Sequence, residues 1–299
     1  MIVMNSMNPT LFPIGKTAEI CGVSTRTLRF YEENGLILPD KVDEENRYRY
    51  YTYDTMRRIQ TIRYLLDEGF DLATIQDMLH KDDLINLKEH FLSQITETET
   101  QIRYQKQRLA SLHAWCALLI EGNYVLEHRD CSVHTRYIEE QPYFHFHHTP
   151  ANDEERTEAF LETRYFTESK KDGHTMIDMG GAFHILYNSY ADRMSGTAKE
   201  ITLLQTVYPD SESMENTISF GGFLAVTCYH IGSTDTILST YETMLEWAKE
   251  HGFPLQGNAL ERQVLDVYSV GSEENYVTEI LLPAAGDFSD IGNSSDWQW

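Results

Sequence analysis

The sequence predicts an α+β protein in which an N-terminal winged helix-turn-helix is joined by one long helix to a C-terminal duplicated βαββ domain. Three observations predict this fold: two short capped helices followed by a basic, strand-favouring segment, a heptad repeat of apolar residues, and two later stretches with the same order of elements. The 299 residues are enough for two such domains and a connector. We place the domain boundaries at 1–82, 83–122 and 123–285, and an acidic tail follows over 286–299.

Two short helices open the first domain. The first is predicted over 15–21 and ends at Gly22, which suits the left-handed backbone of a helix C-terminus. Ser24 can cap a second helix over 25–34. A helix, a tight turn and a second helix is the geometry that places the second helix in the major groove of DNA, although a generic helical hairpin has the same pattern. The side chains expected to reach bases or phosphates are Thr25, Arg26, Arg29 and Tyr31.

A basic wing and two further helices are predicted next. Residues 36–52 contain a turn at 43–46 and then a run with strand-favouring composition. A third helix begins at Thr52, and Asp71 caps a fourth. Basic and aromatic side chains grouped on one small winged unit indicate contact with the phosphate backbone. These side chains are Arg47, Arg49, Tyr50, Arg57 and Arg58.

Residues 12–80 resemble the DNA-binding domain of MerR-family transcription regulators. The motifs that carry the resemblance are IGKTAEICGVS, TRTLRFYEENGLILP, NRYRYYT and MRRIQTIRYLLDEGFDLATIQDML. The resemblance implies a homodimer that binds a palindromic operator in double-stranded promoter DNA. It also implies that the protein acts on transcription by RNA polymerase, by distorting DNA between promoter elements that are spaced too far apart.

The charge is divided unevenly along the chain. The net charge is −23, of which residues 1–81 carry −2 and the remainder −21. DNA binding must therefore depend on where the arginines of the first domain lie, and we expect it to be strongly salt-dependent. There is no apolar N-terminal run and no continuous apolar span of about 20 residues, so we expect neither a signal peptide nor a membrane helix. The four scattered cysteines fit a reducing cytoplasm, and no cofactor is predicted.

The connector over 83–122 is predicted to be a dimerisation helix that ends at Gly122. Alternating steps of four and three residues define a seam in which seven of nine positions are apolar. This period favours a coiled coil between two chains over a helix packed on its own domain. In the MerR family the corresponding helix pairs antiparallel with that of the dimer mate. The seam consists of Phe91, Ile95, Thr98, Ile102, Gln105, Leu109, Leu112, Cys116 and Leu119.

The remaining chain shows two stretches that each predict strand, helix, strand, strand. In the first, the strands are expected at 143–148, 174–179 and 182–187, with a helix over 153–166. In the second, the strands are expected at 222–230, 260–269 and 276–282, with a helix over 236–251. A weak internal duplication follows from this order. FGGFLAVTCYHIGSTDTILSTYETMLEWAKEHGFPLQGNALERQVLD and NYVTEILLP resemble the GyrI-like effector-binding domain, which implies a small-molecule cleft between two such halves.

Two strand glutamates are the candidates for effector binding. Glu261 and Glu279 have apolar neighbours, and an inward carboxylate is costly unless something compensates it, whereas an outward one is simply solvated. The resemblance to multidrug-sensing regulators implies that Glu261 receives a lipophilic cation and that Tyr276 helps to enclose it. We therefore predict a cleft shared by both glutamates and a cationic or aromatic ligand. Aromatic wall candidates, each of which also fits core packing, are Tyr187, Tyr268 and Phe223.

Two other functions remain open. Cys116 and Cys131, with nearby histidines, could sense a soft metal, but the compact paired-cysteine loop of metal-sensing relatives is absent. Some GyrI-like proteins hydrolyse small electrophiles, and Glu279 with a tyrosine could act as an acid/base pair. Because a DNA-binding domain is attached, we expect a regulator and not an enzyme.

Overall fold

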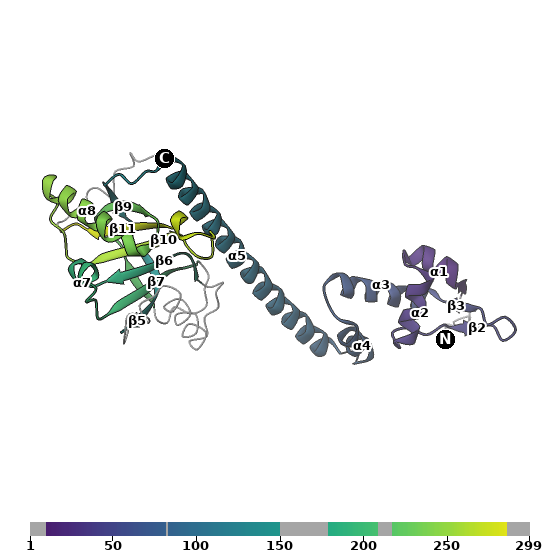
Figure 1. The fold of residues 1–299 in the computed structure, drawn as a ribbon. Helices are drawn as coiled ribbons and strands as arrows, with labels where there is room; N and C mark the ends of the chain where they lie inside the picture. The colour runs from purple at the N-terminus through teal and green to yellow at the C-terminus, as the bar shows by residue number, and fades with distance from the viewer. Residues whose placement is uncertain (1–9, 82, 150–178, 209–216, 286–299) are drawn as a thin grey trace. The chain divides into compact units, whose positions relative to one another are not determined.

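The computed structural model describes residues 10–81, 83–149, 179–208 and 217–285 (Figure 1). The chain divides into two compact units, Met1–Gln101 and Ile102–Trp299. Each unit has its own hydrophobic core, so each is described by itself.

The N-terminal unit is a winged helix-turn-helix, as predicted. Its three-stranded sheet has the order β1-β3-β2, and a short β1 that was not predicted pairs with β3. Leu28, Ile59, Ile62 and Ile75 are completely buried between its helices. The elements are β1 (Phe12–Pro13), α1 (Ile14–Cys21), α2 (Thr25–Glu33), β2 (Lys41–Val42), β3 (Arg49–Tyr51), α3 (Tyr53–Asp67) and α4 (Leu72–Lys81).

The predicted caps set the helix boundaries in this unit. The Ser24 side chain accepts a hydrogen bond from the backbone N–H of Thr27, and Thr52 does the same for Thr55. Asp71 accepts from the N–H of Thr74 at 2.8 Å before α4. Each cap satisfies a backbone donor that the first turn of a helix leaves without a partner.

The connector is one helix, α5, over Leu84–His128. The predicted end at Gly122 is wrong, because Gly122 lies inside α5 against Leu265, where a Cβ atom would come within 2.3 Å of the leucine side chain. The glycine therefore serves close packing of the helix on the sheet and not helix termination. The seam side chains Ile95, Ile102, Leu109, Leu112 and Leu119 are each between 45% and 59% exposed in the single chain.

By length and composition alone α5 is apolar enough to cross a membrane, since an 18-residue window reaches a mean hydropathy of 1.2. Seven of its apolar residues nevertheless lie on the heptad seam, and on another face Glu121 contacts Arg262 of the sheet. We interpret α5 as a coiled-coil helix, and the absence of a membrane helix remains a prediction.

The C-terminal unit is built on an eight-stranded sheet with the order β4-β9-β11-β10-β6-β7-β5-β8. The two short segments η2 (Thr234–Thr236) and η3 (Glu273–Asn275) are 3-10 helices. The strands are β4 (His134–Ile138), β5 (Gln141–His148), β6 (Met179–Tyr187), β7 (Ile201–Val207), β8 (Thr217–Phe220), β9 (Phe223–Ile231), β10 (Ala259–Leu265) and β11 (Val277–Pro283), and the helices are α7 (Tyr190–Ser195) and α8 (Leu238–Glu250).

The strand order agrees with an internal duplication. The order β9-β11-β10 in one half mirrors the order β5-β7-β6 in the other, and the halves meet where β10 pairs antiparallel with β6. The second half matches the prediction. In the first half the strands predicted at 143–148 and 182–187 lie within β5 and β6, whereas β7, joined to β6 through α7, was not predicted. The strand predicted at 174–179 falls almost entirely outside the described residues. The helix predicted over 153–166 lies outside the described residues.

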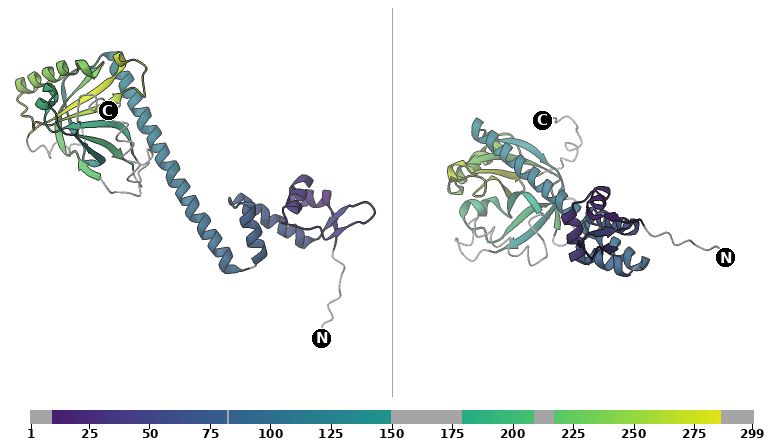
Figure 2. Two further views of the ribbon diagram at one scale, coloured as in Figure 1. Left: turned by 60° about the horizontal axis from the view of Figure 1, so that its bottom comes forward. Right: turned by 90° about the vertical axis from the view of Figure 1, so that its right-hand side faces the viewer.

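The two faces of the sheet pack against different helices (Figure 2). Ile280 and Leu282 point toward α8 and join a core with Tyr241 and Met244. Val277, three residues from Ile280 and five from Leu282 on the same strand, packs with Leu118 and Val125 of α5. Because strand side chains alternate between faces, every site residue can be assigned to the α8 face or the α5 face.

Candidate DNA-binding surface and effector pocket

One face of α2 carries the candidate DNA-reading side chains. Gly22, with φ 64°, forms the turn before the helix, and Leu28 and Tyr31 bury the opposite face in the domain core. Tyr31 is only 4% exposed, so the prediction that it contacts DNA is wrong. Helical periodicity sets this outcome, since position 31 lies one turn after Leu28. The exposed side chains of α2 include Thr25, Arg26, Arg29 and Phe30, of which Phe30 was not predicted.

The wing is tied to α2 by Glu32. Arg49 Nε donates to Glu32 Oε2 at 2.7 Å, and the Tyr51 hydroxyl donates to the other carboxylate oxygen. Burial, followed by its bond to Glu32, raises the pKa of Tyr51. Arg47 lies exposed in the turn with φ 60°, and Tyr50 is half-buried. Arg47 of the wing is therefore exposed to solvent, while Arg49 fixes the orientation of the wing relative to α2.

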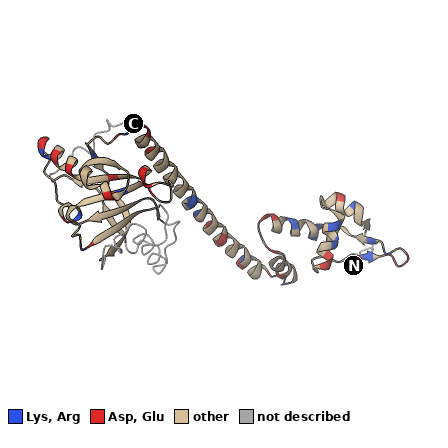
Figure 3. Ribbon diagram, in the orientation of Figure 1, with Lys and Arg blue, Asp and Glu red and all other residues tan. Residues whose placement is uncertain are grey.

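The arginines of α3 have internal partners. Exposed Arg57 pairs with Asp54. Half-buried Arg58 donates from Nε to the Leu36 carbonyl at 2.7 Å, which holds the segment after α2. In Figure 3, the Lys and Arg positions of this unit fall largely on α2, α3 and the wing. The geometry gives Arg58 a structural role, and its phosphate contact stays a prediction.

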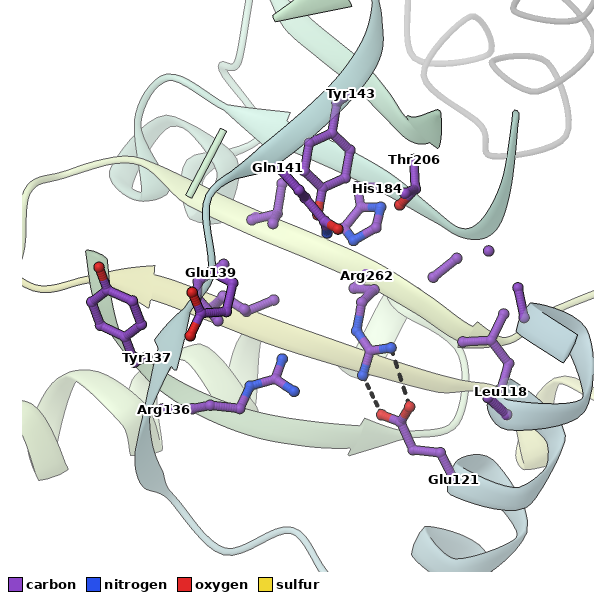
Figure 4. A pocket seen from close by; sticks show the side chains of 17 residues that line it. Leu118, Glu121, Arg136, Tyr137, Glu139, Gln141, Tyr143, His184, Thr206 and Arg262 are labelled. Carbon is purple, nitrogen blue, oxygen red and sulfur yellow. Dashed lines mark hydrogen bonds and ion pairs between the residues drawn. The ribbon is translucent and has the colours of Figure 1, made fainter. Parts of the chain in front are cut away.

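A cavity of about 390 Å³ lies on the α5 face of the C-terminal sheet (Figure 4). A volume of this size is within the range of small-molecule sites. We call it the effector pocket, and its walls include Leu118 and Glu121 of α5, Arg136 of β4, Tyr143 of β5, His184 of β6 and Arg262 of β10.

A charge network forms one side of the effector pocket. Glu279, whose side chain is 1% exposed, accepts from Arg262 Nε at 2.6 Å and pairs with Arg136 Nη2 at 2.7 Å. Arg262 also pairs with Glu121, which accepts from the Tyr229 hydroxyl at 2.7 Å. Burial alone would lower the pKa of Arg262, but Glu279 and Glu121 raise it. The network links four strands, β4, β9, β10 and β11, to α5 and contains two positive and two negative groups.

The opposite side of the pocket is uncharged. His184 is 5% exposed, and burial, followed by the nearby Arg262 charge, lowers its pKa to about 3. Its ring lies edge-on to Tyr143 at 5.4 Å between centroids, and Gln141 donates to the Tyr143 hydroxyl at 2.6 Å. Figure 4 shows these side chains together with Thr206 across from Arg262. The neutral imidazole provides hydrogen-bonding capacity without charge.

Glu261 faces α8, on the other side of the sheet. It pairs with Arg193 Nε at 2.7 Å and accepts from the Tyr241 hydroxyl at 2.9 Å, with the Tyr187 hydroxyl at 3.5 Å. Arg262 neighbours Glu261 in β10 and lies opposite Glu279, so the two glutamates point to opposite faces. The prediction that Glu261 and Glu279 share one cleft is therefore wrong, and both carboxylates are already paired with arginines of the same chain.

The chain was compared with known proteins. Residues 12–82 match the family model described as MerR HTH family regulatory protein. The HTH-type transcriptional regulator GlnR of Bacillus anthracis is 31% identical over 93 residues, which are 30% of this chain and 70% of GlnR. The chain belongs to the MerR HTH family.

The C-terminal half of this MerR HTH family member matches a second family model, the GyrI-like small molecule binding domain, over residues 146–285. The Multidrug-efflux transporter 2 regulator of Bacillus subtilis is 24% identical over 274 residues, covering 91% of this chain and 95% of the relative. The cryo-EM structure of an EcmrR-DNA complex is 19% identical, with a TM-score of 0.43, and covers 91% of this chain and 99% of that chain.

The predicted aromatic residues are dispersed in this MerR HTH protein. Tyr187 is buried beside Glu261 on the α8 face, while Tyr268 is 60% exposed in a turn. Tyr276 directly precedes β11, and Phe223 packs against Phe220 at 5.3 Å between ring centroids. The pocket residues that sequence reasoning missed include Glu121, Arg136, His184 and Arg262, because only strand pairing and the packing of α5 on the sheet bring them together.

The cysteines do not assemble a metal site in the described part of the chain. Cys116 and Cys131 are exposed, whereas buried Cys228 donates to the Cys131 carbonyl at 3.1 Å. Among the described residues, no group of three or more His, Cys, Asp or Glu side chains is arranged to hold a metal ion. Glu279, the acid/base candidate for hydrolysis, is covered by two guanidinium groups. The geometry of the described residues therefore supports neither metal sensing nor hydrolysis.

Proposed function

We propose that this chain is a homodimeric transcription regulator that binds promoter DNA through residues 12–82 and responds to a small molecule in the effector pocket. The family and the exposed face of α2 support DNA binding. The match to a small molecule binding domain and the cavity of about 390 Å³ support ligand binding. A DNA-binding regulator acts where the chromosome is, so we place it in the cytoplasm of a bacterium.

The geometry of α5 is the observation that carries this proposal. Leu112, Cys116 and Leu119 belong to the seam, while Ala114, Leu118 and Glu121 line the effector pocket. At 3.6 residues per turn, these two sets lie on opposite faces of the helix. A ligand in the pocket therefore touches the back of the surface that would pair with a second chain.

This arrangement suggests how ligand binding reaches the DNA. A ligand shifts a conformational equilibrium only through different affinities for the two states. Movement of α5 against the sheet would change both the pocket wall and the seam. We propose that the ligand-bound dimer distorts promoter DNA so that RNA polymerase can engage promoter elements that are otherwise spaced too far apart, as the resemblance to the MerR family implies.

Selection from a random duplex library tests the DNA-binding part. Full-length protein should enrich palindromic sequences, because a symmetric dimer reads two half-sites. The same selection with Arg26→Ala and Arg29→Ala together should lose enrichment, while Lys88→Ala on the exposed surface of α5 serves as the control. Enrichment of no sequence by the wild-type protein would contradict the proposal.

A further inference from the structure

The charges beside the effector pocket are already compensated within the protein. Glu279 receives Arg262 on one oxygen and Arg136 on both, at 2.6 to 2.9 Å. Glu121 receives Arg262 and the Tyr229 hydroxyl. A cationic ligand would have to displace a guanidinium group that the fold holds in place, and removing one partner from a buried ion pair is costly.

The groups that face the cavity differ from those buried behind it. Arg136 and Arg262 line the pocket, whereas Glu279 does not line it and has a side chain only 1% exposed. A cation in the pocket would find no free carboxylate in this network, because Glu279 and Glu121 are already paired with the two arginines. Glu139 also lines the pocket, but it is exposed, where solvent screens its charge.

An anion is also disfavoured. It would face the carboxylate of Glu121 at the pocket wall, in a C-terminal portion that carries most of the net charge of −23. The two arginines have little charge left to offer, because Glu279 and Glu121 neutralise them. The remaining polar wall includes the neutral groups Gln141, Tyr143, His184 and Thr206.

Unused hydrogen-bonding capacity lies in the same wall. Arg136 Nε and His184 Nδ1 are buried and have no hydrogen-bond partner among the described residues. A buried polar atom without a partner destabilises the folded protein, so a ligand that provides one after a small shift of these side chains gains affinity. Leu118, Leu260 and Leu281 supply apolar surface beside these groups.

We propose that the effector pocket selects an uncharged ligand that combines an apolar ring with a hydrogen-bond acceptor such as a carbonyl oxygen. The acceptor lies toward the guanidinium groups of Arg136 and Arg262, and the ring lies against the leucines. This inference rests on the proposed function, because it assigns a chemical class to the ligand of the same pocket. It replaces the lipophilic cation expected from the sequence, whose basis was an uncompensated glutamate.

Three probes with one ring system test the ligand class. The probes are 2-acetylnaphthalene, which is uncharged, 2-naphthoate, which is anionic, and (2-naphthyl)trimethylammonium, which is cationic. Calorimetric titration of the full-length protein should show the ketone binding at least ten-fold more tightly than either ion. Equal or tighter binding of the cation or of the anion would overturn the proposed class while leaving the proposed function intact.

The variant Arg136→Met tests whether the preference for the uncharged probe arises in the pocket. It removes one of the two guanidinium groups that pair with Glu279, so the ratio of ketone affinity to cation affinity should fall at least ten-fold. Arg136→Lys keeps the charge and should retain the preference, and Arg129→Met changes an exposed arginine outside the pocket. If the variant with methionine does not fold, the ranking of the three probes on the wild type still decides the class. Binding of none of the probes would instead contradict the effector pocket and with it the proposed function.

Discussion

Replacing Gly122 by Ala tests how closely α5 is held on the sheet. A Cβ atom at this position would lie 2.3, 2.5 and 2.7 Å from Leu265 Cγ, Cδ1 and Cδ2, whereas ordinary contacts are 3.4–4 Å. Overpacking of this kind costs about 1–3 kcal/mol. Alanine regains about 1 kcal/mol of helix propensity over glycine, so the net loss in the free energy of unfolding should be about 0–2 kcal/mol.

The double variant Gly122→Ala/Leu265→Ala makes this prediction specific. Leu265→Ala alone should cost about 2–5 kcal/mol, because Leu265 is only 3% exposed. In the double variant the three clashing atoms are gone and the new methyl group fills part of the cavity. The two changes should therefore be less destabilising together than the sum of the single effects, by roughly 1–3 kcal/mol.

Urea unfolding followed by tryptophan fluorescence measures these energies. All four tryptophans lie after residue 101, so the signal reports on the C-terminal unit. Gly271→Ala, in the same C-terminal unit and with nothing within 4 Å of its new Cβ atom, is the control and should not destabilise. Additivity of the two changes within about 0.5 kcal/mol would refute the close packing of α5 on β10.

Three further perturbations address DNA reading, assembly and pH. Arg26→Ala should cost roughly 1–3 kcal/mol of operator affinity and relax sequence choice in gel-shift titrations, since Arg26 is exposed on α2; an unchanged affinity would remove it from the interface. Changing Ile102 and Leu109 together to Asp places charges in the seam and should give monomers with little operator affinity by sedimentation, whereas a stable mutant dimer would show that other contacts suffice. Because the pKa of His184 is lowered from 6.5 to about 3, the unfolded chain binds a proton that the folded protein does not. The contribution of His184 to the free energy of unfolding should thus be complete above pH 6.5, and the free energy should fall toward pH 3 by at most about 1.4 kcal/mol per pH unit. The variant His184→Gln should reduce that slope, and an identical slope would contradict burial of a neutral imidazole.

Local signals were sufficient for the N-terminal unit. Gly22, Ser24 and Asp71 act over three or four residues, so the helix boundaries they set could be predicted from the sequence. Tyr31 shows the limit of the same reasoning. A tyrosine is compatible with both a surface and a core, and only the packing of α2 on α1 and α3 buries it.

The charge network could not be predicted in this way. Arg136 and Glu279 are 143 residues apart, and Arg262 and Glu121 are 141 residues apart. No spacing rule connects such positions, because the register between strands and the packing of α5 on the sheet bring them together. The sequence by itself determined the family, the DNA-binding unit, the heptad seam and the order of strands in the second half. Only the tertiary structure decided that Glu261 and Glu279 occupy opposite faces and that both are already paired, because a side chain's face and partners depend on strands that meet from distant parts of the chain.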